Sequence, residues 1–174
     1  MWKDVPISDA GTIRHEMAAS ALSEVVFGLR WQGAALKNSE FTRASDLDAS
    51  CMLLNERNDL IEIVHPAHQR NVNGSVVHTG DSKTGGGSWD NERIHVFLRA
   101  LPEEVSKVLF VVTSVNGELF EEIGTAFCHV TNTVTDELLF GCDLSRPSSR
   151  NADVVARLRR VDGDWKLQTP FAKD

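Results

Sequence analysis

Short apolar runs rich in β-branched and aromatic residues recur along the whole chain, and turn residues separate them at close intervals. Runs of this length and composition are typical of β-strands. Three Xaa-Gly pairs, Asn73-Gly74, Asn116-Gly117 and Asp162-Gly163, supply the positive φ that a two-residue hairpin needs. Many short strands joined by tight turns predict an all-β fold, an antiparallel β-sandwich.

We predict ten strands and a single domain over residues 1–174, because no linker, repeat or low-complexity segment interrupts the pattern. The predicted strands are Glu24–Trp31, Leu47–Leu54, Leu60–His65, Ser75–Thr79, Arg93–Leu98, Lys107–Val115, Thr125–Thr131, Glu137–Cys142, Val154–Arg160 and Asp164–Thr169. The run at 107–115 is nearly continuous in apolar residues, so we expect a central strand that is buried on both faces. Asn116-Gly117 would then turn it back toward residues 118–122.

Helical periodicity is weak almost everywhere. Only residues 11–22, with Ile13, Met17 and Ala21 four residues apart, predict a short amphipathic turn or helix.

The composition excludes several classes of protein. No apolar run approaches the ~18 residues of a membrane span, and the N-terminus lacks the apolar core of a secretion signal, so we expect a soluble, cytoplasmic protein with no direct membrane insertion. The net charge of −7 argues against a nucleic-acid partner, which demands clustered Lys and Arg. Cys51, Cys128 and Cys142 form no Cys-x-x-Cys pattern, and we interpret them as reduced, mostly buried thiols.

Two acidic segments carry the functional signal. Strand alternation places Asp46, Asp48 and Ser50 on one face and their apolar neighbours on the core face. About thirty residues later, the glycine-rich bend at residues 80–92 holds Asp81, Asp90 and Glu92. Crowded carboxylates repel one another unless a cation lies between them. Calcium takes six to eight oxygen ligands in a forgiving geometry, and the glycines would let backbone carbonyls approach as further ligands.

The chain resembles the TerD family of tellurium-resistance and bacterial stress-response proteins over roughly residues 20–170. The residues that carry the resemblance are Phe27-Gly-Leu-Arg-Trp31, Asp46-Leu-Asp-Ala-Ser50, Val77-His-Thr-Gly-Asp81, Thr84-Gly85, Asp90-Asn-Glu92, Val108-Leu-Phe-Val-Val112, Asp143-Leu-Ser145 and Gly163-Asp-Trp-Lys166. The combination of the two acidic segments in this order is far more specific than either segment alone.

The resemblance implies a β-sandwich that binds calcium (Ca²⁺) and acts in stress resistance, alongside protein partners. Carried over by position, the implied ligands are Asp46, Asp48, Asp81, Asp90 and Glu92, helped by backbone oxygens from Ser82 to Ser88. The chain departs from the family pattern where Gln32, Ala44, Ser82, Ser88 and Asn91 stand at positions that usually carry acids or, at Ser82, an Asn. Because calcium sites are tuned by ligand charge, we expect one or two weakened sites.

Three alternatives stay open. One is a metal-free interaction scaffold whose calcium loops have degenerated. A hydrolase with a metal-activated water would need a general base that the sequence does not offer, so we expect no enzyme. A transition-metal site at His65, His68, His78 and His95 lacks a fixed geometry. We expect His78 to hydrogen-bond the loop that it precedes, and Trp89 to be a packing anchor that orders the glycine-rich bend.

Overall fold

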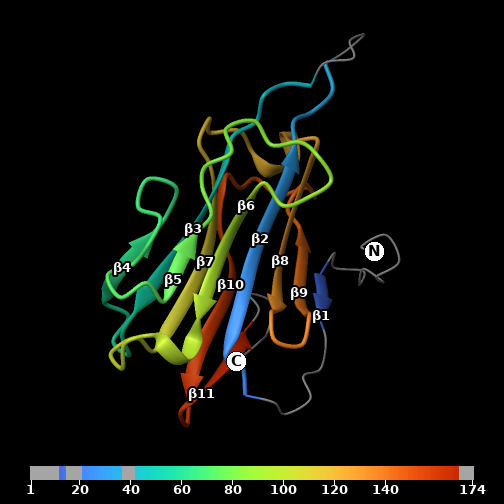
Figure 1. Ribbon diagram of the computed structural model, residues 1–174. Coiled ribbons are helices and arrows are strands. Elements are labelled where there is room, and N and C mark those ends of the chain that lie inside the picture. The colour runs from blue at the N-terminus through green and yellow to red at the C-terminus, as the bar shows by residue number, and fades with distance from the viewer. Residues whose placement is uncertain (1–11, 15–20, 37–41, 169–174) are drawn as a thin grey trace.

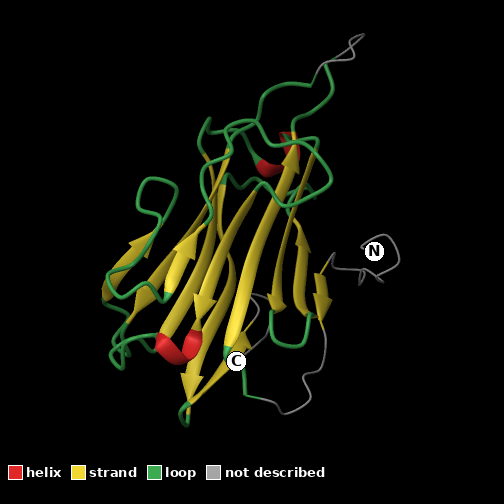
Figure 2. Cartoon of the chain, viewed as in Figure 1, coloured by secondary structure: helices red, strands yellow, loops and turns green. Residues whose placement is uncertain are grey.

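The computed structural model describes residues 12–14, 21–36 and 42–168. Within these residues, strands form two antiparallel sheets that pack face to face, and the helical content is confined to short 3₁₀ turns (Figures 1 and 2). The first sheet has six strands in the order β1-β9-β8-β2-β6-β5. Its strands are β1 (Thr12–Arg14), β2 (Glu24–Gln32), β5 (Val76–His78), β6 (Glu92–Phe97), β8 (Thr125–Asn132) and β9 (Glu137–Asp143).

The second sheet has five strands in the order β11-β10-β7-β3-β4. Its strands are β3 (Leu47–Leu54), β4 (Leu60–Val64), β7 (Lys107–Ser114), β10 (Ala152–Val161) and β11 (Asp164–Gln168). The 3₁₀ turns η2 (Leu98–Ala100) and η3 (Phe120–Glu122) lie in connections between strands of different sheets. In the described part of the chain no helix is long and apolar enough to span a bilayer.

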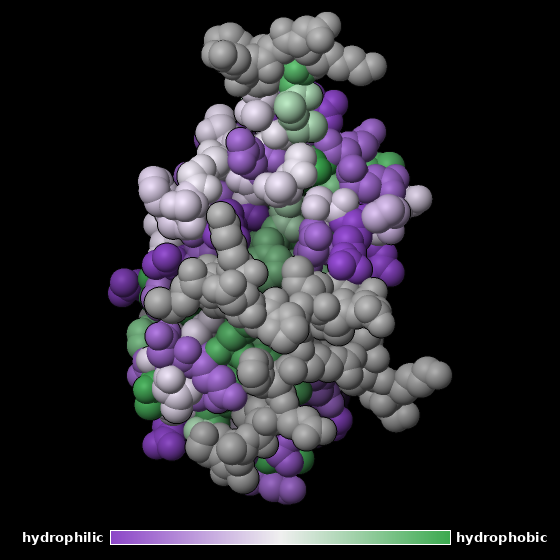
Figure 3. Space-filling model, turned by 90° about the vertical axis from the view of Figure 1, so that its right-hand side faces the viewer, coloured by the Kyte–Doolittle hydropathy of each residue, from purple (hydrophilic) through white to green (hydrophobic). Residues whose placement is uncertain are grey.

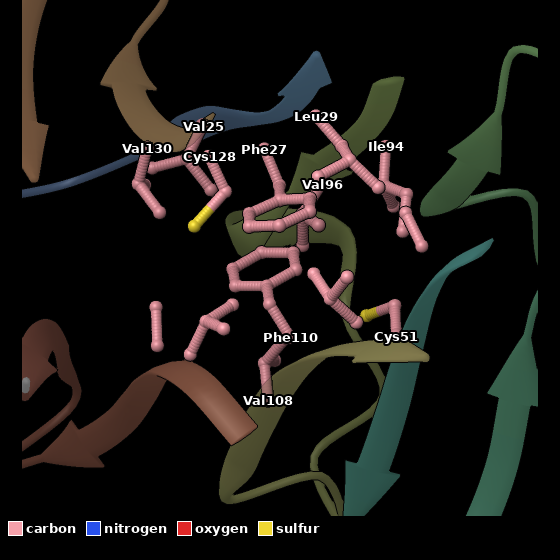
Figure 4. Close-up of a cluster of buried hydrophobic side chains, with 14 of the residues drawn as sticks. Val25, Phe27, Leu29, Cys51, Ile94, Val96, Val108, Phe110, Cys128 and Val130 are labelled. Carbon is pink, nitrogen blue, oxygen red and sulfur yellow. The ribbon is translucent and has the colours of Figure 1, made fainter. Parts of the chain in front are cut away.

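One apolar core fills the space between the sheets. Its centre is the stacked pair Phe27 of β2 and Phe110 of β7, whose ring centroids are 4.9 Å apart (Figure 4). Both rings are fully buried, and they come from the two opposite sheets. Removing a buried Phe side chain typically costs about 3–5 kcal/mol. The stack is therefore a main contact that holds the two layers together.

The predicted antiparallel β-sandwich is confirmed, and within the described residues each of the ten predicted strands is present with bounds that differ by two residues or fewer; Thr169, the predicted end of the last strand, lies outside the described residues. The turn at Asp162-Gly163 is a two-residue hairpin, because Val161 pairs with Asp164. Both turn residues have positive φ, 52° and 85°. This is the φ combination that the right-handed twist of a hairpin favours.

Three expectations differ from the structure. The region 11–22 was predicted as a helical turn, but Thr12–Arg14 forms β1 along β9; residue 11 and residues 15–20 lie outside the described residues. The strand β7 is central as predicted, yet its burial alternates, so one face packs on the core and the other is half-buried. Asn116-Gly117 turns the chain, but the next strand, β8, lies in the other sheet.

Candidate acidic metal site

The first acidic segment leads into β3, and strand alternation decides which way its side chains point. Leu47 and Ala49 are fully buried in the core. Asp48 and Ser50 occupy the alternate positions and are half-buried, as predicted. Asp46 directly precedes the strand and is also half-buried. The apolar register of β3 therefore fixes the face on which the carboxylates stand.

The structure brings Asp81 to the same place from the loop that joins β5 to β6, which crosses the upper end of the sandwich in Figure 1. Asp46, Asp48 and Asp81 each offer one carboxylate oxygen, and the three oxygens lie within 4.8 Å of one another. We call these three residues the acidic triad. Two ligands of one calcium ion, each at 2.3–2.6 Å from it, are at most about 5 Å apart. The spacing of the triad is therefore compatible with one shared ion.

The triad is electrostatically crowded. Burial raises the pKa of Asp48 to about 6, and the negative charges of Glu92, Asp46 and Asp81 add to the rise. Burial and the charge of Asp81 also raise the pKa of Asp46. The Oδ1 atom of Asp46 is buried and has no hydrogen-bond partner. Since buried polar atoms are normally paired, an unpaired carboxylate oxygen beside two other carboxylates fits a site built for a cation.

Glu92 and Ser82, both predicted ligands, are not part of the triad but hydrogen-bond to the segments around it. Glu92 is fully buried at the start of β6. Its Oε2 accepts a hydrogen bond of 2.8 Å from the N–H of Ala49, and its Oε1 accepts one of 3.2 Å from the N–H of Ser82. Glu92 thus ties β6 of one sheet to β3 of the other and to the glycine-rich loop. It supports the triad by positioning β3 and the loop, and Ser82 contributes its backbone N–H to this support.

His78 completes this buried support. The N–H of Gly80 donates to Nδ1 of His78 at 3.0 Å, which confirms the predicted bond from His78 to its own loop. Because Nδ1 accepts, a neutral His78 ring carries its proton on Nε2. That nitrogen lies 3.3 Å from Oε2 of Glu92, and both side chains are inaccessible to solvent. The contact with Glu92 does not have hydrogen-bond geometry, so the hydrogen bond from Gly80 is what fixes the start of the loop that carries Asp81.

The anchor of the glycine-rich bend is Trp31, so the prediction that Trp89 plays this part is wrong. Trp89 is 66 % exposed, whereas Trp31 is 1 % exposed. The indole Nε1–H of Trp31 donates to the Ser45 carbonyl at 2.7 Å, which positions the segment just before Asp46. The Trp31 carbonyl accepts a hydrogen bond from the N–H of Gly86 at 2.7 Å.

Asn91 joins the same network, a role that sequence reasoning missed. Its Oδ1 accepts from the Trp31 N–H at 2.9 Å, and its Nδ2 donates to the Gly86 carbonyl at 2.6 Å. A Cβ on Gly85 would lie 2.5 Å from Nε1 of Trp31, and Gly85 has a φ of +64°, so only glycine fits there. The signal in the sequence was the glycine run itself, which marks a loop that passes close to another group.

Asp90 does not join the triad. Its carboxylate lies 3.1 Å from Nε2 of His129 and accepts a hydrogen bond from Nε of Arg93 at 3.1 Å. Burial works against ionisation of Asp90, but the hydrogen bonds from His129 and Arg93 outweigh it and lower its pKa. Gly28 on β2 leaves room for this arrangement, because a Cβ there would lie 2.2 Å from the His129 ring.

This second arrangement belongs to a pocket of about 620 Å³ lined by residues of β2, β6, β8 and β9 and of the glycine-rich loop. The pocket lining includes Arg30, Trp89, Asp90, Arg93 and His129. The Asp90 side chain is thus held by Arg93 and His129 at the pocket and is not part of the acidic triad.

The donor set of the triad favours a hard cation. Carboxylate oxygens suit calcium, magnesium and manganese, whereas zinc and copper prefer imidazole and thiolate. Among the described residues, the triad is the one group of three metal-ligating side chains that lie this close, and it contains no His or Cys. His68, considered for a transition metal, has its Nε2 at 3.0 Å from Oε1 of Glu62 instead.

Comparison with known proteins places the chain in a family. The TerD domain model matches residues 7–170. Tellurium resistance protein TerZ of Serratia marcescens is 33 % identical over 159 residues, which cover 88 % of this chain and 82 % of the relative. General stress protein 16U of Bacillus subtilis (strain 168) is 33 % identical over 154 residues, which cover 84 % of this chain and 78 % of the relative.

A solved structure agrees with the fold. The crystal structure of a homologue of the telluride resistance protein TerD from Streptomyces coelicolor A3(2) superposes with a TM-score of 0.73 at 18 % identity, covering 85 % of this chain and 88 % of that one. The match of the domain model to nearly the whole chain, together with the sandwich and the relatives, establishes the affiliation: this protein belongs to the TerD family.

Proposed function

We propose that this protein is a cytoplasmic, calcium-binding stress-response module that acts by binding and assembly with protein partners and is not an enzyme. The single observation that carries the proposal is the acidic triad, in which oxygens of Asp46, Asp48 and Asp81 lie within 4.8 Å of one another. The residues fit the ion, because the buried Oδ1 of Asp46 lacks a hydrogen-bond partner and the pKa of Asp48 is raised to about 6.

In this proposal the chain supplies three carboxylates and a rigid frame. Asp46 and Asp48 lie at the start of β3, which packs on the core, and Asp81 comes from the glycine-rich loop, which hydrogen bonds to Trp31 and Glu92 hold in place. A bound divalent cation would relieve the repulsion among the carboxylates and tie the loop to β3. Backbone carbonyls of the glycine-rich loop and water would supply the remaining ligands.

The stress-response part of the proposal rests on the relatives. Their names describe tellurium resistance and general stress, and the chain matches them over most of its length. A cytoplasmic location is supported by three free thiols, which are typical of proteins in a reducing compartment.

Thermal unfolding of metal-stripped protein, with and without calcium, tests the calcium site. A ligand at about 100 times its dissociation constant stabilises the folded state by about 2.7 kcal/mol. For a chain of this size each kcal/mol raises Tm by roughly 2–4 °C, so saturating calcium should raise Tm by roughly 5–10 °C. Asp48→Asn and Asp81→Asn should each abolish the rise.

A matched control removes the same charge elsewhere. Asp162→Asn lies in the hairpin between β10 and β11, at the opposite end of the sandwich, and Asn tolerates the positive φ of 52° there. This variant should keep the full calcium-induced rise. A rise that survives in both Asp48→Asn and Asp81→Asn would refute the assignment of the ligands.

A second candidate function is a metal-free interaction scaffold, and one specific contact favours it. Nζ of Lys83 lies 3.3 Å from Oδ2 of Asp81, so the chain itself can place a positive charge beside the triad. In that case neither calcium nor magnesium would change Tm up to millimolar concentration. The same titration therefore separates the two functions.

A further inference from the structure

Cys128 and Cys142 stand directly opposite each other in the β8–β9 ladder. Opposed residues of an antiparallel pair project from the same face of the sheet, with Cα atoms about 4.5 or 5.5 Å apart according to the hydrogen-bonding position. Both separations lie within the 4.4–6.8 Å that a disulfide spans. This position in the ladder is therefore compatible with a disulfide between the two thiols.

The two thiols differ in access to solvent. Cys128 is fully buried against the core, and Figure 4 shows its sulfur pointing inward. Cys142 is half-buried and lines a pocket of about 420 Å³ together with Asp143, Arg146 and Arg150. Figure 3 views the side of the molecule that carries β9, where apolar and hydrophilic residues lie side by side on the surface. A small polar oxidant in this pocket would meet Cys142 first.

The two thiols also differ in reactivity. Hydrogen bonding between the facing thiols, helped by the positive charge of Arg146, lowers the pKa of Cys142, and it outweighs the opposing effects of burial and of Asp143. Burial raises the pKa of Cys128. Since the thiolate is the nucleophile, Cys142 is suited to react first and Cys128 to follow. Cys51 is alone in the core, and burial raises its pKa strongly.

We propose that Cys128 and Cys142 form a redox site at which a hydroperoxide converts the facing thiols into an intrachain disulfide. The Cys142 thiolate attacks one peroxide oxygen, the O–O bond breaks, and the leaving hydroxide takes a proton to become water. Cys128 then attacks the sulfur of the Cys142 sulfenic acid, the S–O bond breaks, and the departing hydroxide takes the Cys128 proton. Two thiols and one hydrogen peroxide give one disulfide and two waters.

Peptide mapping tests this proposal in the whole chain. Folded protein is treated with a small excess of hydrogen peroxide, denatured, alkylated with N-ethylmaleimide and digested with trypsin. No Lys or Arg lies between residues 108 and 145, and trypsin does not cleave after Arg146 because Pro147 follows it, so both cysteines fall on the tryptic peptide 108–150, while Cys51 falls on 44–57. Peptide 108–150 should lose two alkyl groups and the mass of two hydrogen atoms. Cleavage after Glu137 should leave two fragments that only reduction separates.

Three variants separate the roles. Cys142→Ser should leave Cys128 fully alkylated after peroxide, and Cys128→Ala should stop at a Cys142 sulfenic acid that dimedone traps. Cys51→Ala should form the cross-link as wild type does. Met52 lies on peptide 44–57 and reports that peroxide has acted. If Met52 oxidises while peptide 108–150 stays doubly alkylated, or if Cys142 links two chains instead, the proposal is overturned.

Discussion

Lys83 forms an ion pair with Asp81, with 3.3 Å between Nζ and Oδ2. Lys83 is fully exposed, and the hydrogen bond and negative charge of Asp81 raise its pKa, followed by the charges of Asp46 and Asp48. A residue proposed as a calcium ligand is thus already paired with a cation on a flexible side chain. The ion would have to displace this cation to use Asp81 fully.

Replacing Lys83 should therefore strengthen calcium binding. Surface ion pairs are weak, so we expect Lys83→Met to raise calcium affinity only about two- to fivefold. Isothermal titration calorimetry measures the change. Lys166→Met on β11 removes the same charge from an exposed position of the opposite end of the sandwich and should leave the affinity nearly unchanged. A weaker affinity in Lys83→Met would show that Lys83 supports the site.

The pH dependence should follow Asp48. Its pKa is raised to about 6 in the folded protein, above that of an unfolded Asp. In metal-stripped protein the folded state therefore binds more protons than the unfolded state between about pH 4 and pH 6. The resulting stabilisation is complete below the unfolded pKa and is lost as pH rises through 6. Calcium binds the ionised carboxylate, so the stabilisation that calcium gives should increase as the pH rises through 6.

Two series of melting curves check this prediction. The calcium-induced rise in Tm should be full at pH 7.5 and should shrink strongly by pH 5. Without metal, Asp48→Asn should remove part of the gain in stability that wild type shows on acidification from pH 7 to pH 5. A calcium effect of equal size at both pH values would contradict the role of Asp48.

Asn91 should be a structural residue of the loop and not a ligand. Asn91→Ala removes both hydrogen bonds of its side chain, to the Trp31 N–H and to the Gly86 carbonyl. Leaving such groups unpaired costs about 1–3 kcal/mol, which lowers Tm by roughly 2–12 °C. Ser88→Ala, at an exposed position of the same loop, is the control and should leave Tm within about 2 °C of wild type. An unchanged Tm in Asn91→Ala would disprove the loop role.

Glu92→Gln tests the buried support of the triad. The amide has one acceptor oxygen where the carboxylate has two, so the N–H of Ala49 or of Ser82 loses its partner. Hydrogen bonds to charged groups are worth about 1.5–3 kcal/mol, so Tm of the metal-free protein should fall by roughly 3–12 °C.

Glu92→Gln also has a stabilising effect, because it removes a negative charge that repels Asp48 and raises its pKa. This repulsion is partly screened by solvent at the half-buried Asp48, so the loss of the hydrogen bond should dominate. Glu103→Gln in an exposed connection is the matched control. A higher Tm in Glu92→Gln would mean that repulsion among the carboxylates outweighs the support that Glu92 gives.

The strands could be predicted well because two local signals, the alternation of apolar and polar side chains and the turn residues between strands, agree along most of the chain. In β3 the alternation of Leu47, Asp48 and Ala49 fixes which side chains face the core. At Asp162-Gly163 the turn residues fix the register of β10 and β11. The strand β1 was missed because a three-residue strand has no periodicity of its own and exists through its pairing with β9.

The candidate site could be predicted only in part. The alternation of side chains along a strand predicted that Asp46 and Asp48 lie on one face. The resemblance to the TerD family predicted that Asp81 joins them. The directions in which the side chains of Asp90 and Trp89 point could not be predicted. A glycine-rich loop has no fixed period, and its path depends on contacts with residues that are distant in the sequence. These contacts, from Trp31 on β2 and His129 on β8, decide which loop residues turn toward the triad.

Direct calcium titration of metal-stripped protein at pH 7.5, by isothermal titration calorimetry, tests the central claim. We predict saturable binding in wild type and Asp162→Asn, and loss of that binding in Asp48→Asn and Asp81→Asn. Absence of binding up to millimolar calcium in wild type, or undiminished binding in both triad variants, would contradict the proposed site.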